Sequence, residues 1–442
     1  MIIIDKALQF REDIGNPIRV GIMGAGYMAV GIVNQIIRYT PGMEVAVICN
    51  RSLDKAMNCY RRAGVQQVGV GETAAQLDQM IRNKQAAVTQ DPDVVCQAQE
   101  VDIILEATGT IAYAARVVMD AIAHGKPVVL MNAELDATLG PILKDYADRA
   151  GVMLSGSDGD QPGVIMNLYR FVKNMGFTPL VCGNIKGFLD LHKNPTDMLP
   201  FAENMGQNVN MITNFTDGTK IAFEQASVAN ATGMGVSKRG MNAFRSKEHI
   251  DKLTQLYDVD ELKAMGGIVD YAVGPEPGPG VYVYATTEDE LSKEYLHYLK
   301  LGKGPIYSFY TPFHLCLFEI PNSIARVFHF TDPVMAPIGA PVVEVATTAK
   351  TDLKAGQTLD GFGGFTAYGQ CENASVFRKE NLLPIGLAEG VVLKRDVAKD
   401  QAISFDDIVY PTDHLVFKLY EEQVARFFPE DSLKPKYQSV IA

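Results

Sequence analysis

The chain has 442 residues and a formal net charge of −12, with 47% hydrophobic and 21% charged residues. The length predicts two or three domains, and the composition excludes a disordered protein because it provides enough apolar side chains for large cores. The acidic balance disfavours nucleic acid or an anionic membrane as a partner, whereas a few basic side chains in a cleft would suffice for an anionic small substrate.

Two further features bear on the compartment. No apolar run approaches the roughly 20 residues that span a bilayer, and the N-terminus has no basic region followed by a long apolar stretch. The six cysteines are scattered without a C-x-x-C pair, which argues against a structural zinc site and a disulfide framework. We therefore expect a soluble, unexported protein in the reducing cytoplasm.

The first pattern along the chain is an apolar strand, a glycine turn and a helix start within residues 18–29. The turn reads G-x-G-x-x-A, and residues 30–37 give the helix an apolar face. Such a turn brings the backbone close to a pyrophosphate and points the helix N-terminus at its charge, although an ordinary tight turn is the alternative. We predict a dinucleotide site that includes Gly24, Ala25, Gly26, Tyr27 and Met28.

Strands and helices continue to alternate up to about residue 155. The sequence predicts strands at residues 44–49, 101–107, 128–131 and 152–154, and helices at 53–63, 112–124 and 137–150. Near-continuous apolar strands between amphipathic helices are typical of a parallel sheet covered on both faces. Residues 1–160 are therefore predicted to be a doubly wound Rossmann domain of the α/β class.

The end of the second strand predicts which dinucleotide binds. An acidic residue about 20 positions beyond the glycine turn would bind the ribose hydroxyls of NAD. This chain has Asn50, Arg51 and Ser52 there, without a carboxylate, and Arg51 could pair with a 2′-phosphate. NADP is therefore favoured, and the alternative is that Ser52 caps the next helix while Arg51 is solvated.

Three more residues follow predicted strands. Thr108 and Gly109 come after the fourth strand, and Asn132 comes after the fifth. Because the carboxyl ends of parallel strands form a cleft, we include these residues in the cofactor site. A glycine at such a place can also serve the turn alone.

The pattern changes at the turn-rich segment 155–163, which we take as a domain boundary that lines the cleft. Helices at 164–175 and 219–232 and strands at 180–183 and 280–285 predict an α+β central catalytic domain at residues 161–338. Short strands and turns from about residue 342 predict a β-rich third domain at residues 339–442.

Polar side chains of the middle region are candidates for the chemical step. Segment 184–193 brings two lysines, an aspartate and a histidine after a strand. Lys220, Glu224 and Ser227 form a polar stripe on an otherwise apolar helix, which faces either a cleft or solvent. His314 lies in an apolar segment, where it serves either the core or the site. No spacing specifies a metal, although Mg²⁺ or Mn²⁺ held together with the substrate stays open.

The basic loop Ser237-Lys238-Arg239 follows a glycine-rich turn. It could clamp a phosphate, because guanidinium and ammonium groups bind phosphate oxygens strongly. Its alternative is an exposed basic turn.

Residues 21–26, 106–109 and 129–134 resemble the homoserine dehydrogenase-like oxidoreductases, which join a Rossmann domain to a central catalytic domain. The chain departs from homoserine dehydrogenases at their Asn-Lys pair and their later Asn-Gly-Thr motif, so homoserine is not the expected substrate. Residues 349–356, 383–388 and 397–403 resemble a SAF domain, a β-clip module. The combination is similar to the 1-deoxy-D-xylulose-5-phosphate reductoisomerase-like (DRL) family.

The resemblance implies an NADPH-dependent reductoisomerase that makes 2-C-methyl-D-erythritol 4-phosphate for isoprenoid synthesis, with a small phosphorylated sugar as substrate and a homodimer as the assembly. For proton transfer and oxyanion stabilisation, we expect Lys193, Lys220 and His314, oriented by Asp160 and Glu224. Ser237, Lys238 and Arg239 would hold the phosphate. The alternatives are a dehydrogenase of another small hydroxy acid or polyol and a non-catalytic NADP sensor.

Overall fold

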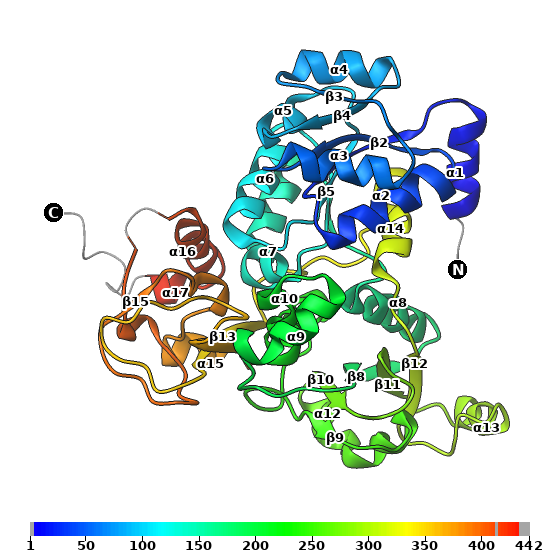
Figure 1. Cartoon of the computed structure of the whole chain (residues 1–442). Helices are drawn as coiled ribbons and strands as arrows, with labels where there is room; N and C mark the ends of the chain where they lie inside the picture. The colour runs from blue at the N-terminus through cyan, green and yellow to red at the C-terminus, as the bar shows by residue number, and fades with distance from the viewer. Residues whose placement is uncertain (1–3, 412–413, 433–442) are drawn as a thin grey trace. The chain divides into compact units, whose positions relative to one another are not determined.

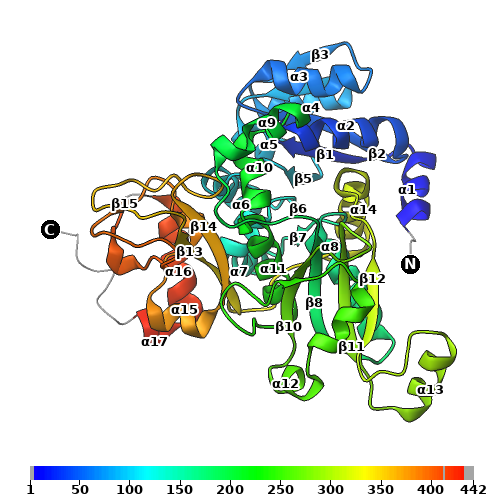
Figure 2. The same cartoon turned by 60° about the horizontal axis from the view of Figure 1, so that its bottom comes forward.

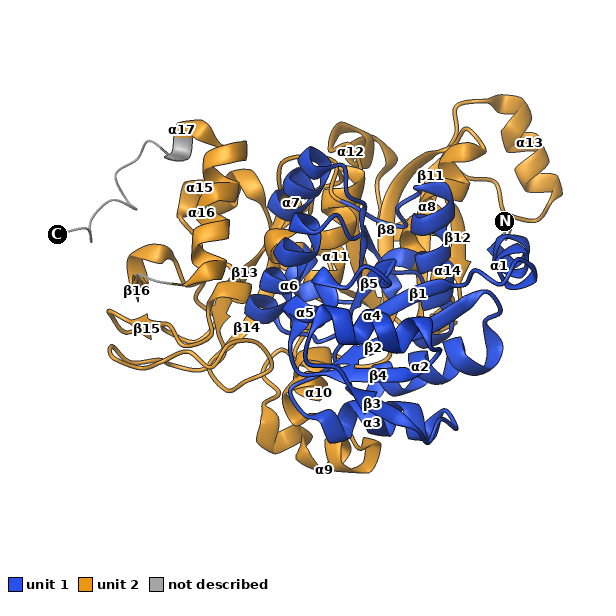
Figure 3. Cartoon of the chain, turned by 90° about the horizontal axis from the view of Figure 1, so that it is seen from above, with its two compact units in different colours: residues 1–136, 142–163, 315–336 blue, residues 137–141, 164–314, 337–442 orange. Residues whose placement is uncertain are grey.

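The computed structural model describes residues 4–411 and 414–432 (Figure 1). The chain forms two compact units (Figure 3). Unit 1 comprises residues 1–136, 142–163 and 315–336, and unit 2 comprises residues 137–141, 164–314 and 337–442. Residues 315–336, which the sequence placed in the central domain, thus belong to unit 1. The division into three domains at 160 and 338 is not tested by these units and stays a prediction.

Unit 1 contains a seven-stranded sheet in the order β3-β4-β2-β1-β5-β6-β7, with every pairing parallel. The strands are β1 Ile18–Met23, β2 Met43–Cys49, β3 Val68–Val70, β4 Ala86–Thr89, β5 Ile103–Glu106, β6 Val128–Leu130 and β7 Leu154–Gly156. The helices are α1 Ile4–Asp13, α2 Tyr27–Tyr39, α3 Leu53–Arg62, α4 Ala74–Arg82, α5 Pro92–Gln97, α6 Ile111–Ala123, α7 Ala133–Ala150 and α14 Cys316–Phe330. The predicted α/β class and Rossmann-type sheet are confirmed.

The numbering of the predicted strands needs a correction. The strands predicted at 101–107 and 128–131, which were numbered fourth and fifth, are third and fourth among the predicted strands and are β5 and β6 of the structure, because the sequence analysis assigned no elements to residues 64–100, where β3, α4, β4 and α5 lie. β3 has three residues at the edge of the sheet and is partly exposed, so it carries no apolar run. Helix α7 begins at Ala133 rather than residue 137, because the Asn132 side chain accepts a hydrogen bond from the Leu135 amide at 3.0 Å and caps it.

The core of unit 1 explains why α14 belongs to it. Ile320 and Ile324 of α14 are fully buried in the same apolar cluster as Ile32 and Ile36 of α2. Complete burial of one such side chain contributes roughly 1.5–3 kcal/mol. A Cβ atom at Gly31 would lie 2.8 Å from Leu317, so the glycine permits α14 to pack closely on α2.

Unit 2 contains a five-stranded mixed sheet in the order β12-β11-β8-β10-β9. Its strands are β8 Thr178–Lys186, β10 Ile268–Val273, β11 Gly280–Thr286 and β12 Tyr307–Thr311 (Figure 2) and the short β9 Phe244–Arg245 (Figure 1). The helices are α8 Gln161–Asn174, α9 Pro195–Met205, α10 Val209–Thr216, α11 Thr219–Thr232, α12 Val259–Ala264 and α13 Glu290–Tyr298. All residues of α11 except the last are buried, so this helix forms the centre of the unit.

The C-terminal part of unit 2 packs on α11. Its strands are β13 Val343–Ala349, β14 Ala367–Asn373, β15 Val392–Leu393 and β16 Ile408–Val409, and its helices are α15 Ala374–Glu380, α16 Leu415–Phe427 and α17 Pro429–Ser432. The Thr219 hydroxyl of α11 accepts a hydrogen bond from the Gly369 amide at 2.8 Å. Asn230 Oδ1 accepts one from the Val342 amide at 2.7 Å. The SAF likeness of this β-rich region stays a prediction.

None of the helices within the described residues has both the length and the apolar character that crossing a membrane requires.

Candidate active site

The glycine turn between β1 and α2 is held by the two neighbouring strands. Gly24 has a φ of +103°, a conformation that favours glycine, and its amide donates to the Cys49 carbonyl at 2.8 Å. A Cβ atom at Gly24 would lie 3.0 Å from the Ala107 carbonyl oxygen. Both the backbone conformation and the space therefore require glycine at this position.

Gly26 is the N-cap of α2 and leaves the end of the helix open. No side chain caps the helix there, its first turn carries no acidic residue, and a Cβ atom at Gly26 would meet nothing within 4 Å. Ala25 is buried, Met28 packs against the core and Tyr27 is 60% exposed. An open helix N-terminus beside a glycine turn fits a pyrophosphate, because its amides can donate to the anion. The contacts of these five residues with a cofactor stay predictions.

Glu106 at the end of β5 organises the neighbouring loops, although the sequence analysis did not include it among the site residues. Its carboxylate is completely buried, accepts from the Thr108 amide at 2.9 Å and bonds to the Thr108 hydroxyl. It also accepts from Asn132 Nδ2 at 2.9 Å. Burial raises the pKa of Glu106 to about 7. A carboxylate inside an apolar strand was the signal in the sequence that could have identified it.

Asn132 and Gly109 complete this edge of the sheet. Asn132 Nδ2 also donates to the Thr110 carbonyl at 2.9 Å, so its side chain joins the ends of β5 and β6. Gly109 has a φ of +69° and shapes the loop after β5. The structure thus brings Thr108 and Asn132 together through Glu106.

The segment after β2 combines helix capping with an exposed cation. Asn50 Nδ2 donates to the Ser52 carbonyl at 2.9 Å, and the Ser52 hydroxyl accepts from the Lys55 amide at 3.4 Å. The Arg51 carbonyl accepts from Gln90 Nε2 at 2.6 Å, and the residue is exposed. An exposed guanidinium at this place fits a 2′-phosphate. Ser52 therefore caps α3, as its alternative role predicted, while Arg51 keeps its predicted role as a proposal.

In unit 2, a buried charged cluster joins β8 to α11. Glu224 Oε2 accepts from Asn184 Nδ2 at 2.9 Å and from Lys186 Nζ at 3.1 Å. Glu224 is 4% exposed and Asn184 is fully buried, whereas the Lys186 side chain is 19% exposed, so the carboxylate of the ion pair is buried and its ammonium is partly accessible. Asn184 and Lys186 are two positions apart on β8 and therefore face the same side of the sheet. The sequence placed both in a polar segment without relating them to Glu224.

The polar stripe of α11 is buried rather than solvated. Lys220 is 9% exposed and lies one turn before Glu224, while Ser227 is fully buried. Gln225 Nε2 donates to the Asp270 carbonyl of β10 at 2.7 Å, which fixes the helix against the sheet. The solvated alternative is excluded.

A second buried ion pair supports the N-terminal end of α11. Lys350 Nζ bonds to Asp217 Oδ2 at 2.7 Å and to the carbonyls of Lys193 and Gly364 at 2.9 and 2.8 Å. Asp217 Oδ1 accepts from the Thr219 amide at 3.0 Å. Lys350 is 1% exposed, and burial raises the pKa of Asp217 although Lys350 opposes that shift. Lys193 therefore enters this cluster through its carbonyl, and its ammonium role stays a prediction.

The basic loop after α11 makes internal contacts. Arg239 donates to Glu372 at 2.8 Å and to Glu380 at 2.6 Å. Ser237 Oγ bonds to Asn242 at 3.1 Å, and Lys238 is exposed. Arg239 would have to exchange these carboxylates for a phosphate, so Ser237 and Lys238 are the more accessible part of the predicted clamp.

The two remaining candidates lie in different units. Asp160 of unit 1 accepts from the Gln161 amide at 3.0 Å and from the Cys316 thiol at 3.8 Å. His314 of unit 2 follows β12 and is half-buried. Within the described part of the chain, no group of three or more His, Cys, Asp or Glu side chains has the arrangement of a metal site. A metal requirement stays open.

The fold and the glycine turn define a Rossmann-type domain with a turn that suits a dinucleotide. Residues 24–155 match the family model "Homoserine dehydrogenase, NAD binding domain", and residues 159–320 match "Oxidoreductase DRL, catalytic domain". Both matches agree with the resemblance seen in the sequence. The chain is thus an oxidoreductase of the DRL and homoserine dehydrogenase-like kind, with a domain for a nicotinamide cofactor.

Solved structures with low sequence identity are also similar. A homoserine dehydrogenase from Thiobacillus denitrificans is 19% identical over 72% of this chain and 75% of its own, with a TM-score of 0.43. A scyllo-inositol dehydrogenase from Lactobacillus casei is 10% identical over 72% and 90%, with a TM-score of 0.38. An Agrobacterium radiobacter oxidoreductase in complex with NAD⁺, L-tartaric acid and magnesium is 16% identical over 39% and 46%, with a TM-score of 0.29.

This chain matches less than half the length of the Agrobacterium radiobacter protein, and likewise less than half the length of a Klebsiella pneumoniae oxidoreductase. No curated protein matches the sequence.

Proposed function

We propose that this chain is an NADPH-dependent reductoisomerase that converts 1-deoxy-D-xylulose 5-phosphate to 2-C-methyl-D-erythritol 4-phosphate. In this reaction a C–C bond of the keto-sugar breaks and another forms, which gives a branched aldehyde. NADPH, when bound, supplies the hydride for the aldehyde carbon. A proton reaches the aldehyde oxygen, so the net reaction consumes one NADPH and one proton.

The buried cluster of Glu224, Lys186 and Asn184 carries this proposal. Rearrangement of a keto-sugar develops negative charge on an enolate oxygen, which a preorganised cation stabilises best where water is excluded. Glu224 Oε2 accepts from the Lys186 ammonium at 3.1 Å and orients it, and Asn184 Nδ2 donates to the same oxygen and fixes the carboxylate. We assign Lys186 to the oxyanion and Glu224 to its positioning.

Lys220 is proposed to transfer the hydroxyl proton. It lies one turn before Glu224 on the same face of α11 and is 9% exposed, and a lysine amine can take up or release a proton within a site. The match of residues 159–320 to the DRL catalytic domain supports placing the chemical step in this region. Lys238 and Ser237 would hold the substrate phosphate.

NADP rather than NAD is proposed from the end of β2. Asn50-Arg51-Ser52 offers no carboxylate to the ribose hydroxyls and leaves Arg51 exposed for a 2′-phosphate. Gly24 and the open N-terminus of α2 fit the pyrophosphate of either dinucleotide. The residues of unit 1 therefore fit the cofactor.

A coupled assay tests the proposal. The protein is mixed with NADPH and 1-deoxy-D-xylulose 5-phosphate, NADPH absorbance is followed, and the product is identified by NMR. We expect NADPH oxidation that depends on the keto-sugar and yields a branched carbon skeleton. The proposal fails if this substrate gives no turnover while a hydroxy acid such as tartrate, or a polyol, reduces NADP⁺, since that result identifies a plain dehydrogenase.

A further inference from the structure

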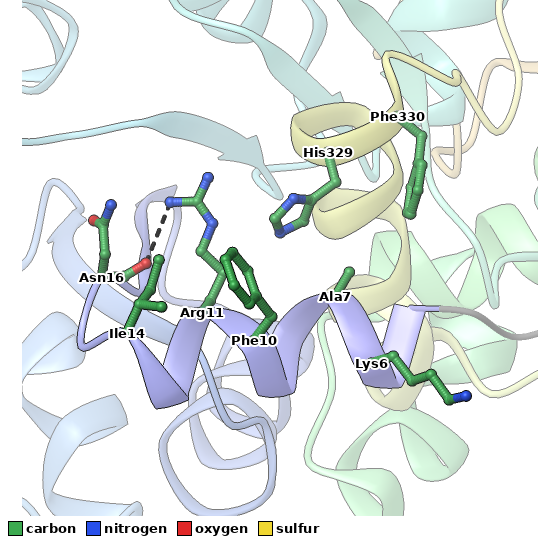
Figure 4. A pocket seen from close by; sticks show the side chains of 8 residues that line it. All are labelled: Lys6, Ala7, Phe10, Arg11, Ile14, Asn16, His329 and Phe330. Atoms are coloured by element: carbon green, nitrogen blue, oxygen red, sulfur yellow. Dashed lines mark hydrogen bonds between the residues drawn. The ribbon is translucent and has the colours of Figure 1, made fainter.

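In unit 1, α1 and the end of α14 enclose a pocket of about 510 Å³, away from the glycine turn (Figure 4). Leu317, which packs on α2, and His329, which lines the pocket, are 12 residues apart on α14, a distance of roughly 18 Å along a helix. The volume lies within the range of small-molecule sites. Neither family match assigns a role to this place.

The lining of the pocket separates into a basic part and an apolar part. Lys6, Arg11 and His329 supply nitrogen atoms, and Phe10, Ile14 and Phe330 supply apolar surface. None of the lining residues, all of which the structure describes, carries a carboxylate. In a chain with a net charge of −12, such a pocket favours an anion with an apolar body.

Two of the three carboxylates of α1 are held by other groups, and the third, Asp5, is exposed and does not line the pocket. Glu12 accepts from the Gly42 amide at 2.8 Å, and Asp13 accepts from Gln9 at 2.9 Å. The Arg11 guanidinium lies over the Phe328 ring at 4.8 Å and donates to the Asn16 carbonyl at 3.3 Å. The pocket therefore keeps its positive character, and one contact with an aromatic ring and one with a carbonyl hold Arg11 in place.

Two nitrogens of the lining residues have unused hydrogen-bonding capacity. Arg11 Nε and His329 Nε2 are buried and bond to no described atom. A buried polar atom without a partner is unfavourable, and a ligand oxygen or a small rearrangement of side chains around a ligand can supply the missing bond. Burial lowers the pKa of His329, and the positive charge of Arg11 adds to this effect, so a neutral imidazole avoids repulsion of the guanidinium.

We propose that this pocket binds a small organic carboxylate with an apolar body. The carboxylate pairs with the Arg11 guanidinium, while Lys6, which lies at the other end of the pocket and points away from Arg11 (Figure 4), adds only long-range positive charge. The body rests on Phe10, Ile14 and Phe330. The ligand is neither the dinucleotide nor the sugar phosphate of the proposed reaction, because a polar, hydroxyl-rich ligand would leave this apolar surface without a partner.

The test uses the full chain with saturating NADP⁺, so that the dinucleotide site is filled. The probe is 3-phenylpropionate, and 3-phenylpropanol is the matched ligand without a charge. Isothermal titration and ligand-detected NMR measure binding. We expect saturable binding of the carboxylate and at least tenfold weaker binding of the alcohol, because the charged hydrogen bonds are absent.

Variants at the pocket complete the test. Ile14 is 52% exposed, so Ile14→Glu adds a negative charge at the pocket without burying it. This variant should bind 3-phenylpropionate at least tenfold more weakly, whereas Ile14→Gln should keep most of the affinity. Arg11→Met should lower the affinity for 3-phenylpropionate by a similar factor, and Arg62→Met on α3 should leave this affinity unchanged. Equal binding of both ligands, binding that survives Ile14→Glu and Arg11→Met, or no saturable binding of the carboxylate would each overturn the proposal.

Discussion

The two functional regions of this chain are made in different ways. In unit 1, the predicted cofactor site depends on backbone: Gly24 adopts a φ of +103°, and Gly26 leaves the end of α2 open. In unit 2, the candidate catalytic cluster depends on side chains, with Lys186 and Asn184 bonded to a buried Glu224. A site of backbone amides tolerates changes of nearby side chains, whereas a buried charge network depends on each of its members.

The same contrast applies to charge. Next to the loops of the predicted cofactor site lies the carboxyl group of Glu106, whose neutral form is favoured by burial. In unit 2, the buried carboxylates of Glu224 and Asp217 instead form ion pairs with lysines. Buried pairs cost desolvation, and losing one partner leaves an uncompensated charge. The two ion-paired clusters of unit 2 should therefore respond to single substitutions more strongly than the loops of the predicted cofactor site.

The largest effect is expected at Lys350. Lys350→Met removes the partner of the buried Asp217 and should lower the free energy of unfolding by about 3–5 kcal/mol. Denaturant unfolding followed by circular dichroism measures it. The control is Lys354→Met, whose pair with Asp396 is largely exposed and should contribute almost nothing. Equal stability of the two variants would contradict the difference between buried and exposed pairs.

The next effect concerns pH. The folded pKa of Glu106 is raised to about 7 from an ordinary value of 4.5, so the folded state holds this proton more tightly than the unfolded state. The contribution of Glu106 to the free energy of unfolding is therefore full below about pH 4.5 and is lost as the pH rises through about 7. The total loss is about 3 kcal/mol. Glu106→Gln removes the titration.

Unfolding measured at pH 5 and pH 8 checks this prediction. The stability of the wild-type chain relative to the Glu106→Gln variant should fall between the two values. Parallel pH profiles of the two proteins would show that folding is not coupled to the ionisation of Glu106 between pH 5 and pH 8, and would contradict the prediction.

The two glycines of the turn should behave differently. Gly24→Ala should cost about 1–3 kcal/mol of stability, because alanine rarely adopts this φ and its Cβ would press on the Ala107 carbonyl. Gly26→Ala should change stability less, since its Cβ meets nothing within 4 Å, but the methyl group would occupy the space of the pyrophosphate.

Thermal unfolding and fluorescence titration with NADPH separate the two effects. Both variants should bind NADPH at least tenfold more weakly, and Gly339→Ala in unit 2 serves as the control that changes neither. If Gly26→Ala binds NADPH normally, the open end of α2 is not the pyrophosphate site.

The smallest effect is expected at Arg51. Arg51→Ala should weaken the binding of NADPH about tenfold and leave the binding of NADH nearly unchanged, because only NADPH carries the 2′-phosphate. The matched control, Arg62→Ala, removes an exposed cation at the far end of α3. Equal losses for NADPH and NADH would refute the predicted NADP preference.

The sequence predicted the elements that depend on local patterns. The glycine turn, the α/β alternation and the limits of α11 at Thr219 and Thr232 agree with the structure. Each of these features is encoded by residues that are close in the chain. The short strand β3 was missed because three partly exposed residues carry no detectable period.

The side-chain clusters could not be predicted in the same way. Glu224 is 40 residues from Asn184, and Lys350 is 133 residues from Asp217, so neither contact leaves a local pattern. Arg239 looked like a free cation because its partners Glu372 and Glu380 come from a distant segment. Sequence alone named Glu224 and Lys220 as polar residues on one face of a helix, and tertiary packing supplied their surroundings.

The most direct test of the account is the conversion of ¹³C-labelled 1-deoxy-D-xylulose 5-phosphate with NADPH, compared between the wild-type chain and Lys186→Met. We predict that the variant forms the branched product at least about 100-fold more slowly, because the oxyanion loses its cation, while its affinity for NADPH is unchanged. Lys247→Met, at an exposed position of unit 2, should keep the wild-type rate. A Lys186→Met variant with the wild-type rate, or a wild-type chain that forms no branched product, would contradict the account.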